Sequence, residues 1–250
     1  MLNVFAVYKE IISKAMHLRI GNTVITKKAK TNTYEIKNEA SPQLMKSIGD
    51  AASFEATDVL TMREYLKRAR HATELYAALR LVHDLGRQMQ SLIADGRGIA
   101  CIGVDDVAII AHRDSDSFTH ESINDMDSTL GDGRMDPRFL FLNDHRIFEL
   151  DDAGALIIDH AISKGKSNHA FMSPELQALL GPSGPSGKEP LQVHFKTVYH
   201  SAAQLVMHFL LNADDLSDDA CWTPIKFTKL HWFLLRCLTP VAADRKYIYI

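Results

Sequence analysis

The sequence predicts an α+β protein in which a smaller strand-rich half precedes a larger helix-rich half. Short β-branched runs bounded by turn residues occupy much of the chain before residue 67. From Glu64 to Asp95 an apolar residue recurs every three or four positions, which is typical of a long amphipathic helix. Two strongly apolar helices are expected after Ser173. The 250 residues suffice for one large domain or for two lobes that share a core.

The composition describes a globular protein that is not built for nucleic acid or lipid. The chain is 46% hydrophobic and 24% charged, with a net charge of −3, so no basic excess indicates nucleic acid as the main partner. No apolar run approaches the roughly 18 residues that would span a bilayer. Lys9, Glu10 and Lys14 interrupt the first apolar stretch, which makes it a poor signal peptide. We therefore expect a cytoplasmic or nuclear location.

The cysteines and histidines predict no metal site. The three cysteines are odd in number and far apart, which favours buried thiols in a reducing compartment over disulfides. Neither His-Glu-x-x-His nor Cys-x-x-Cys occurs among the twelve histidines and the cysteines. The Asp-rich stretch "NDMDSTLGDGRMD" lacks the glycine position and the closing glutamate of a calcium loop. It is expected to be part of an exposed insertion, residues 111–138, that could bind a partner.

The elements before the long helix are predicted from short patterns. "NTVITKKA", from Asn22, is a β-branched strand. "YEIKNEASPQLMKSIG", from Tyr34, has helix-like apolar spacing and a stop at Gly49, although Pro42 breaks it or begins the helix proper. "ASFEATDVLTM" is expected to form one or two further strands.

The later elements alternate between short strands and helices. Five strands are expected at "GIACIG", "VAIIA", "FLFL", "RIFEL" and "ALIID". Gly181 to Pro190 is rich in glycine and proline and predicts a flexible loop. "YHSAAQLVMHFLL" and "FTKLHWFLLRCL" predict apolar helices, the second ending before Thr239-Pro240.

Five segments, in this order, resemble landmarks of the protein kinase family. "LRLVHDLGRQMQSLIADGRGI" resembles the long helix that precedes the kinase catalytic loop, and "DDAGALIIDHA" resembles the strand that ends in Asp-Phe-Gly. "FMSPEL" is similar to the Ala-Pro-Glu motif. "KTVYHSAAQLVMHFLL" and "LLRCLTPVAADR" are similar to two later kinase segments. The resemblance implies a two-lobed fold, with a reduced β-rich N-lobe at 1–66 and a helical C-lobe at 67–250.

The resemblance also implies roles for single residues. "VITKK" resembles the kinase strand whose lysine meets the phosphates, which would make Lys27 that lysine and Glu39 its helix partner. Asp159 would hold Mg²⁺ on ATP, because it matches the aspartate of Asp-Phe-Gly. Glu175 would form a structural ion pair with Arg245. ATP with Mg²⁺ therefore remains an open candidate ligand, with Lys27, Glu39 and Asp159 as its weak site.

Three parts of the kinase machinery are missing from the matched positions. The region of the Gly-rich loop holds only Gly21, beside the bulky Met16 and Leu18. The position of the catalytic-loop aspartate falls on or near Gly103, and that of its asparagine near Val107. The brace aspartate of the following helix is Thr197.

Other acids lie near the missing positions but out of register. These are Asp105, Asp106 and, in a second alignment, Asn143 and Asp144. A literal His-Arg-Asp at residues 112–114 lies in the polar insertion and is interpreted as coincidence.

The implied function is that of a pseudokinase, a kinase fold kept as a surface for protein binding. Such a chain would act as a scaffold, a decoy or an allosteric regulator, with a kinase or a kinase substrate as a candidate partner. Two alternatives stay open. One is a divergent active Ser/Thr protein kinase in which a neighbouring acid replaces the lost base. The other is a structural component of a larger assembly.

Overall fold

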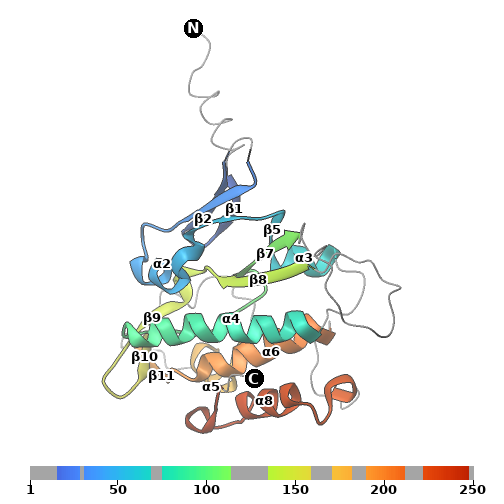
Figure 1. Cartoon of the computed structure of the whole chain (residues 1–250). Helices are drawn as coiled ribbons and strands as arrows, with labels where there is room; N and C mark the ends of the chain where they lie inside the picture. Colours follow the sequence, from blue (N-terminus) through green and yellow to red (C-terminus); the bar gives the residue numbers. More distant parts are fainter. Residues whose placement is uncertain are drawn as a thin grey trace.

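The first sheet of the protein is a four-stranded antiparallel layer in the upper part of Figure 1. This computed structural model describes residues 16–28, 31–68, 75–113, 135–158, 171–181, 190–211 and 222–247. The strands lie in chain order: β1 (Met16–Ile20), β2 (Thr23–Lys27), β3 (Thr33–Lys37) and β4 (Ser53–Glu55). Alternating residues of β2 and β3 face the core, so that Ile25, Tyr34 and Ile36 are buried while Lys27 and Lys37 are exposed.

Helix α2 (Pro42–Ile48) separates β3 from β4. Ser41 is its N-cap and accepts a hydrogen bond from the Leu44 amide, Pro42 opens the first turn, and Gly49 ends the helix at φ 61°. The prediction of one helix-like segment from Tyr34 to Gly49 was wrong in its first half. Thr33–Lys37 is strand because its side chains alternate between core and solvent, a period of two that the apolar spacing of the whole segment hid.

A second sheet links the two halves of the molecule. Its order is β5 (Asp58–Thr61), β7 (Val107–Arg113) and β8 (Met135–Phe141). The pairing of β7 with β8 continues to Arg113 and Met135, so both strands run further into the predicted insertion than the sequence indicated. Residues 114–134 lie outside the described part of the chain.

A third sheet has the order β11-β10-β9-β6. It consists of β6 (Arg97–Ile99), β9 (Ile147–Leu150), β10 (Ala155–Ile158) and β11 (Leu191–His194). Three of its strands correspond to the predicted "GIACIG", "RIFEL" and "ALIID", whereas β11 was not predicted. The predicted loop at Gly181 to Pro190 falls mostly on residues outside the described part.

The longer helices form the lower part of the molecule (Figure 1). Helix α4 (Leu75–Ala94) packs against β8 on one side and against α6 (Thr197–Leu211) on the other. Helix α8 (Lys229–Cys237) packs against α6. Two shorter helices are α3 (Met62–Arg68) and α5 (Pro174–Leu180). In the described residues, no helix combines the length and the apolar character needed to cross a membrane.

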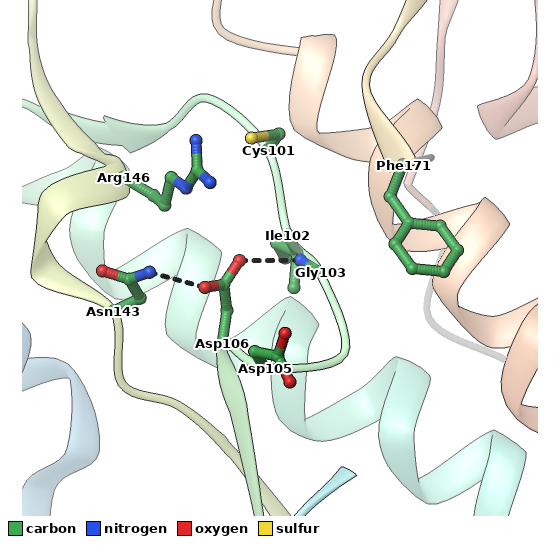
Figure 2. Close-up of a pocket in the computed structure, with 8 residues that line it drawn as sticks. All are labelled: Cys101, Ile102, Gly103, Asp105, Asp106, Asn143, Arg146 and Phe171. Carbon is green, nitrogen blue, oxygen red and sulfur yellow. Dashed lines mark hydrogen bonds between the residues drawn. The ribbon is translucent and has the colours of Figure 1, made fainter. Parts of the chain in front are cut away.

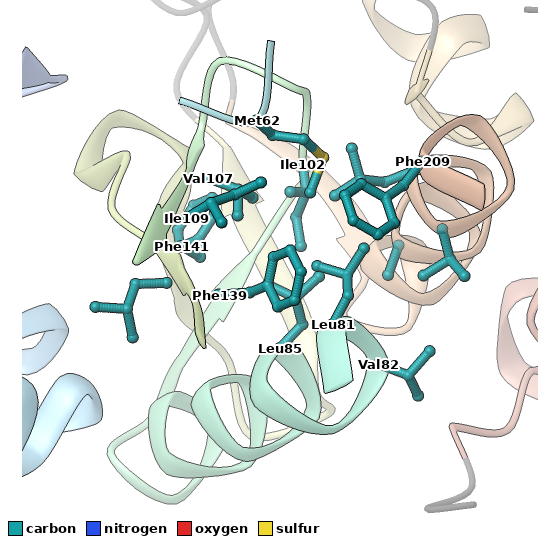
Figure 3. Close-up of a cluster of buried hydrophobic side chains, with 14 of the residues drawn as sticks. Met62, Leu81, Val82, Leu85, Ile102, Val107, Ile109, Phe139, Phe141 and Phe209 are labelled. Carbon is teal, nitrogen blue, oxygen red and sulfur yellow. The ribbon is translucent and has the colours of Figure 1, made fainter. Parts of the chain in front are cut away.

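The main core lies between α4, the β7–β8 hairpin and α6 (Figure 3). The ring of Phe139 meets the ring of Phe209 edge to face, with centroids 5.3 Å apart. Leu81 and Leu85 of α4 are fully buried beside them. Gln88 adds a polar tie, because its side chain accepts from the Phe141 amide at 2.8 Å and donates to the Phe141 carbonyl at 3.2 Å. The long amphipathic helix and the first apolar helix expected from the sequence are thus both present, as α4 and α6, and they pack against each other.

Candidate functional site

The candidate site begins at the loop that follows β6, residues 100–106. Helix α6 holds this loop through Ser201, whose hydroxyl accepts from the Ile102 amide at 2.7 Å and donates to the Ile102 carbonyl at 3.0 Å. The loop then closes as a tight turn in which the Asp106 amide donates to the Gly103 carbonyl at 3.1 Å. The sequence resemblance placed the expected position of the kinase catalytic aspartate on or near Gly103, a residue of this turn.

Asp106 ends the loop at the start of β7 and is 6% exposed. One of its carboxylate oxygens accepts from the Gly103 amide at 2.8 Å, and the other accepts from the Asn143 side-chain amide at 2.5 Å (Figure 2). Burial raises the pKa of Asp106, although the bonds from Asn143 and Gly103 and the charge of Arg146 oppose the rise. Because β7 pairs with β8, the hairpin brings Asn143 beside this loop.

Asp105 lies next to Asp106 but faces another element. Arg63 of α3 grips it with two parallel hydrogen bonds, from Nε at 2.5 Å and from a terminal nitrogen at 2.8 Å. The bond to Asp105 raises the pKa of Arg63. Both oxygens of Asp105 are therefore engaged by a side chain from the segment that follows β5.

Asp144 is held by the turn between β1 and β2. The backbone amide of Asn22 donates to one carboxylate oxygen of Asp144 at 2.9 Å, and the Asn22 side-chain amide donates to the other at 2.9 Å. Burial would raise the pKa of Asp144, but the two bonds from Asn22 and one from Asn38 outweigh it and lower that pKa. Thr23 reinforces the contact, since its hydroxyl donates to the Leu142 carbonyl at 2.6 Å.

Gly21 allows this turn to sit so close. Its φ of 58° is a left-handed conformation, and a Cβ at this position would lie 2.6 Å from an Asp144 oxygen and 2.8 Å from the Asn143 side-chain oxygen. The sequence flagged Gly21 as the single glycine of the expected phosphate-covering loop. The structure gives it another role, as the residue that lets the β1–β2 turn rest on the end of β8.

The pocket that remains is small. Its volume is about 190 Å³, and the residues that line it include Cys101, Gly103, Asp106, Arg146 and Phe171 (Figure 2). Pockets for drug-sized ligands occupy about 300–1,000 Å³. Burial raises the pKa of the Cys101 thiol to about 11, so this cysteine is not a thiolate.

Two of the residues expected to bind nucleotide, Lys27 and Glu39, lie apart from the pocket lining. Lys27 is exposed at the end of β2, with Nζ 5.3 Å from the centroid of the Tyr34 ring. Glu39 is exposed in the bend before α2, and the described residues contain no ion pair between it and Lys27. The antiparallel pairing of β2 with β3 places Lys27 opposite Tyr34, at the other end of β3 from Glu39. The lysine at the end of β3 that leads to α2 is Lys37, whose Nζ lies 3.7 Å from Glu35.

Asp159 itself lies outside the described residues. The strand that precedes it, β10, is described and pairs with β9 and β11. The strand that leads into the pocket is instead β8, which ends beside Asn143 and Asp144. The sequence placed these two residues near the site only in its second alignment.

The Ser-Pro-Glu segment is joined to the last residues of the chain. Arg245 donates to both carboxylate oxygens of Glu175, at 2.5 Å and 2.9 Å, and its side chain is fully buried. Nearby, the hydroxyl of Ser173 hydrogen-bonds the hydroxyl of Thr197, the residue that occupies the position of the kinase brace aspartate. Thr197 thus ties the start of α6 to the N-cap of α5.

The similarity of this chain to known proteins lies among solved structures. No protein-family model matches the chain, and no curated protein matches its sequence. Among solved structures, the Mycobacterium tuberculosis PknI kinase domain is 11% identical and matches 93% of this chain and 94% of its own, with a TM-score of 0.46. The twitchin kinase region from C. elegans is 9% identical and matches 96% of this chain and 47% of its own, with a TM-score of 0.48.

The chain's own elements define the class of protein. A strand-rich lobe with a helix between its third and fourth strands lies above a helical lobe built on α4 and α6. A loop after β6 and the end of β8 meet at a pocket between these parts. The protein therefore has a protein-kinase-like, two-lobed α+β fold with a reduced N-lobe and a helical C-lobe, as the sequence predicted.

Proposed function

We propose that this protein is a pseudokinase, a kinase-like protein that does not transfer phosphate and acts by binding other proteins. The observation that carries the proposal is the state of the acids around the pocket. Asp105, Asp106 and Asp144 each have both carboxylate oxygens engaged by donors of the chain itself, from Arg63, from Gly103 with Asn143, and from Asn22. None of the three presents an unengaged oxygen to Mg²⁺ or to an acceptor hydroxyl.

Phosphoryl transfer depends on positioning and charge neutralisation, and these contacts turn the three carboxylates toward groups of the chain itself, although the Asp105 side chain is still 57% exposed. Releasing one of them would break two hydrogen bonds to a charged group, and such bonds contribute about 1.5–3 kcal/mol each. The turn between β1 and β2 would also have to move. This turn lies directly on Asp144, where phosphates and metal would need room. Both features favour a binding role over catalysis.

The divergent active kinase remains the second candidate, and Asp106 favours it most. This acid lies at the end of the catalytic-loop region, and burial raises its pKa, which is a common property of catalytic acids and bases. A kinase that used it would have to open the pocket around Asn143.

Two measurements separate these functions. The first is the melting temperature with ATP, with and without Mg²⁺ or Mn²⁺. A ligand at a hundred times its dissociation constant would stabilise the native state by about 2.7 kcal/mol, and we expect no such stabilisation. The second is incorporation of radiolabelled phosphate into generic substrates and into the protein itself, where we expect none.

The matched variants are Asp106→Asn and Asp144→Asn, with Asp151→Asn as a control acid outside the pocket. Incorporation by the wild type that Asp106→Asn abolishes and Asp151→Asn preserves would establish the active kinase instead. Binding of ATP without transfer would leave a nucleotide-binding pseudokinase.

A further inference from the structure

The start of α8 carries an aromatic cluster centred on His231. The ring of His231 lies 5.5 Å from Trp222, 6.4 Å from Phe227 and 5.3 Å from Trp232, measured between centroids. Helix α8 lies at the edge of the molecule farthest from the first sheet (Figure 1). The cluster is therefore remote from the pocket and belongs to a separate surface.

This surface is apolar and open. Phe227 is 75% exposed, Trp232 is 53% exposed, Leu235 is 41% exposed and Val241 is 57% exposed. The opposite side of α8 packs into the core through four buried residues, Leu230, Phe233, Leu234 and Cys237. The exposed side chains are thus not needed to fill the core. Exposed aromatic groups on a fixed scaffold are typical of the residues that dominate protein interfaces.

The backbone of Phe227 supports a binding role. Its φ is 66°, and among the described residues no other non-glycine residue has a positive φ. This conformation is a true outlier for a bulky side chain. His231 helps to hold it, because Nδ1 accepts from the Phe227 amide at 3.2 Å. A strained residue that projects its ring into solvent gains nothing from the core, and such strain concentrates at functional surfaces.

Within the segment from Trp222 to Ala243 the charged side chains are of one sign, and the exposed Asp244 follows it directly. Lys226, Lys229 and Arg236 are exposed there, and the Lys226 ammonium lies 5.6 Å from the centroid of the Phe227 ring. The sequence from Trp222 to Ala243 contains no Asp or Glu, although the chain as a whole has a net charge of −3. A partner that fits this surface must offer apolar side chains together with negative charge.

We propose that the α8 surface, defined by Phe227, Trp232, Leu235 and the cations Lys226, Lys229 and Arg236, is a docking site for a protein segment rich in apolar and acidic residues. The proposal does not depend on whether the kinase-like pocket is active, because the two surfaces share no residue. Failure of one can therefore be told from failure of the other.

The variants exploit the strain at Phe227. Phe227→Gly removes the ring and supplies the residue that adopts φ 66° without penalty, so its melting temperature should equal or exceed that of the wild type. Trp232→Ser and the triple reversal Lys226→Glu, Lys229→Glu, Arg236→Glu change only exposed side chains. Leu75→Ser, at an apolar residue 45% exposed on α4, is the matched control.

The probe is a phage-displayed library of random peptides, selected on the folded full-length protein with counter-selection on Trp232→Ser. We expect enriched peptides with apolar and acidic residues. Measured by fluorescence anisotropy, they should bind about tenfold or more weakly to Phe227→Gly and to the triple reversal, and unchanged to Leu75→Ser. A library that yields no peptide discriminating wild type from Trp232→Ser, or yields basic ones, would overturn the proposal.

Two further arms close the alternatives. If the protein floats with phosphatidylserine vesicles, but not with phosphatidylcholine vesicles, and Trp232→Ser abolishes this, the surface binds lipid and the proposal fails.

The acids Asp214, Asp215, Asp218 and Asp219, which precede Trp222 in the sequence, could compete for the same cations. Replacing all four with Asn should leave peptide affinity unchanged or raise it; a loss of affinity would contradict a site that binds acidic partners.

Discussion

The guanidinium of Arg245 and the carboxylate of Glu175 form a two-bond ion pair that fastens the end of the chain to the start of α5. Arg245 is fully buried, while about a quarter of the Glu175 side chain is exposed. Arg245 also donates hydrogen bonds to the carbonyls of the adjacent residues Thr239 and Pro240, so its guanidinium links Glu175 to the segment that follows α8. The ion pair therefore has a structural role that does not depend on catalytic activity.

Arg245→Ala should be among the most damaging single substitutions in the chain. It leaves the Glu175 charge without its partner and two carbonyls without a donor, and breaking a buried pair in this way costs about 3–5 kcal/mol. Chemical denaturation measures the loss. Arg68→Ala, which breaks an exposed pair with Asp58, is the control and should cost less than about 1 kcal/mol. Equal losses in the two variants would contradict the assignment of a buried anchor to Arg245.

The same pair should make the protein sensitive to acid. Burial would raise the pKa of Glu175, but the hydrogen bond from Arg245, helped by bonds from its own backbone amide and from Ser173 and by the charge of Arg245, lowers it from 4.5 to about 2. A lowered pKa means that the folded state binds this proton less readily than the unfolded chain does. The stabilisation is thus complete above pH 4.5 and is lost as the pH falls toward 2.

Glu175→Gln tests this dependence. The variant should be less stable than the wild type at pH 7, and the difference between them should shrink as the pH falls from 4.5 toward 2. Denaturant unfolding curves at successive pH values give the comparison. A difference that stays constant over this range would show that ionisation of Glu175 contributes nothing to stability.

The sequence predicted the helical lobe well because long periodic patterns survive divergence. The apolar spacing of α4 extends over five turns, and α6 is apolar almost all round because it is buried on nearly every side. The segment that became β3 was harder. Five residues of alternation are a weak signal, and the stronger helix signal from Leu44 to Ile48 was extended over it.

The details of the pocket depended on contacts that no local pattern contains. Asn22 and Asp144 are 122 positions apart, and Arg63 and Asp105 are 42 apart. Motif matching gave a functional role to Asp159, which lies outside the described residues, whereas the described strand that leads into the pocket is β8. Strands β8 and β10 both end in an apolar run followed by an acid, so the sequence alone could not distinguish them. The pairing of β8 with β7 is what brings β8 to the pocket, and strand pairing is a tertiary contact that the sequence pattern does not contain.

Gly21 and Gly96 form a natural pair of test positions. Both have positive φ, 58° and 68°, but a Cβ at Gly96 would meet nothing within 4 Å, whereas one at Gly21 would collide with the side-chain oxygens of Asp144 and Asn143. Gly96→Ala should therefore cost only the positive-φ conformation, about 1–2 kcal/mol. Gly21→Ala should cost more, because the Asp144 and Asn143 side chains must also give up their present positions and hydrogen bonds. Thermal unfolding of both variants measures the difference, and equal losses would mean that the turn does not rest on Asp144.

Asn22→Ala should change Asp144 selectively. The substitution removes the side-chain bond to one carboxylate oxygen and leaves the backbone bond to the other, so the pKa of Asp144 should rise toward its usual value. A hydrogen bond to a charged group contributes about 1.5–3 kcal/mol, and the free energy of unfolding should fall by that order. NMR titration of the Asp144 carboxyl carbon reports the pKa directly. Arg63→Ala serves as the control, since it frees Asp105 and should leave the titration of Asp144 unchanged. If Asn22→Ala leaves the Asp144 titration where it is in the wild type, the turn does not hold this carboxylate in solution, and the acids of the pocket are less engaged than the pseudokinase proposal requires.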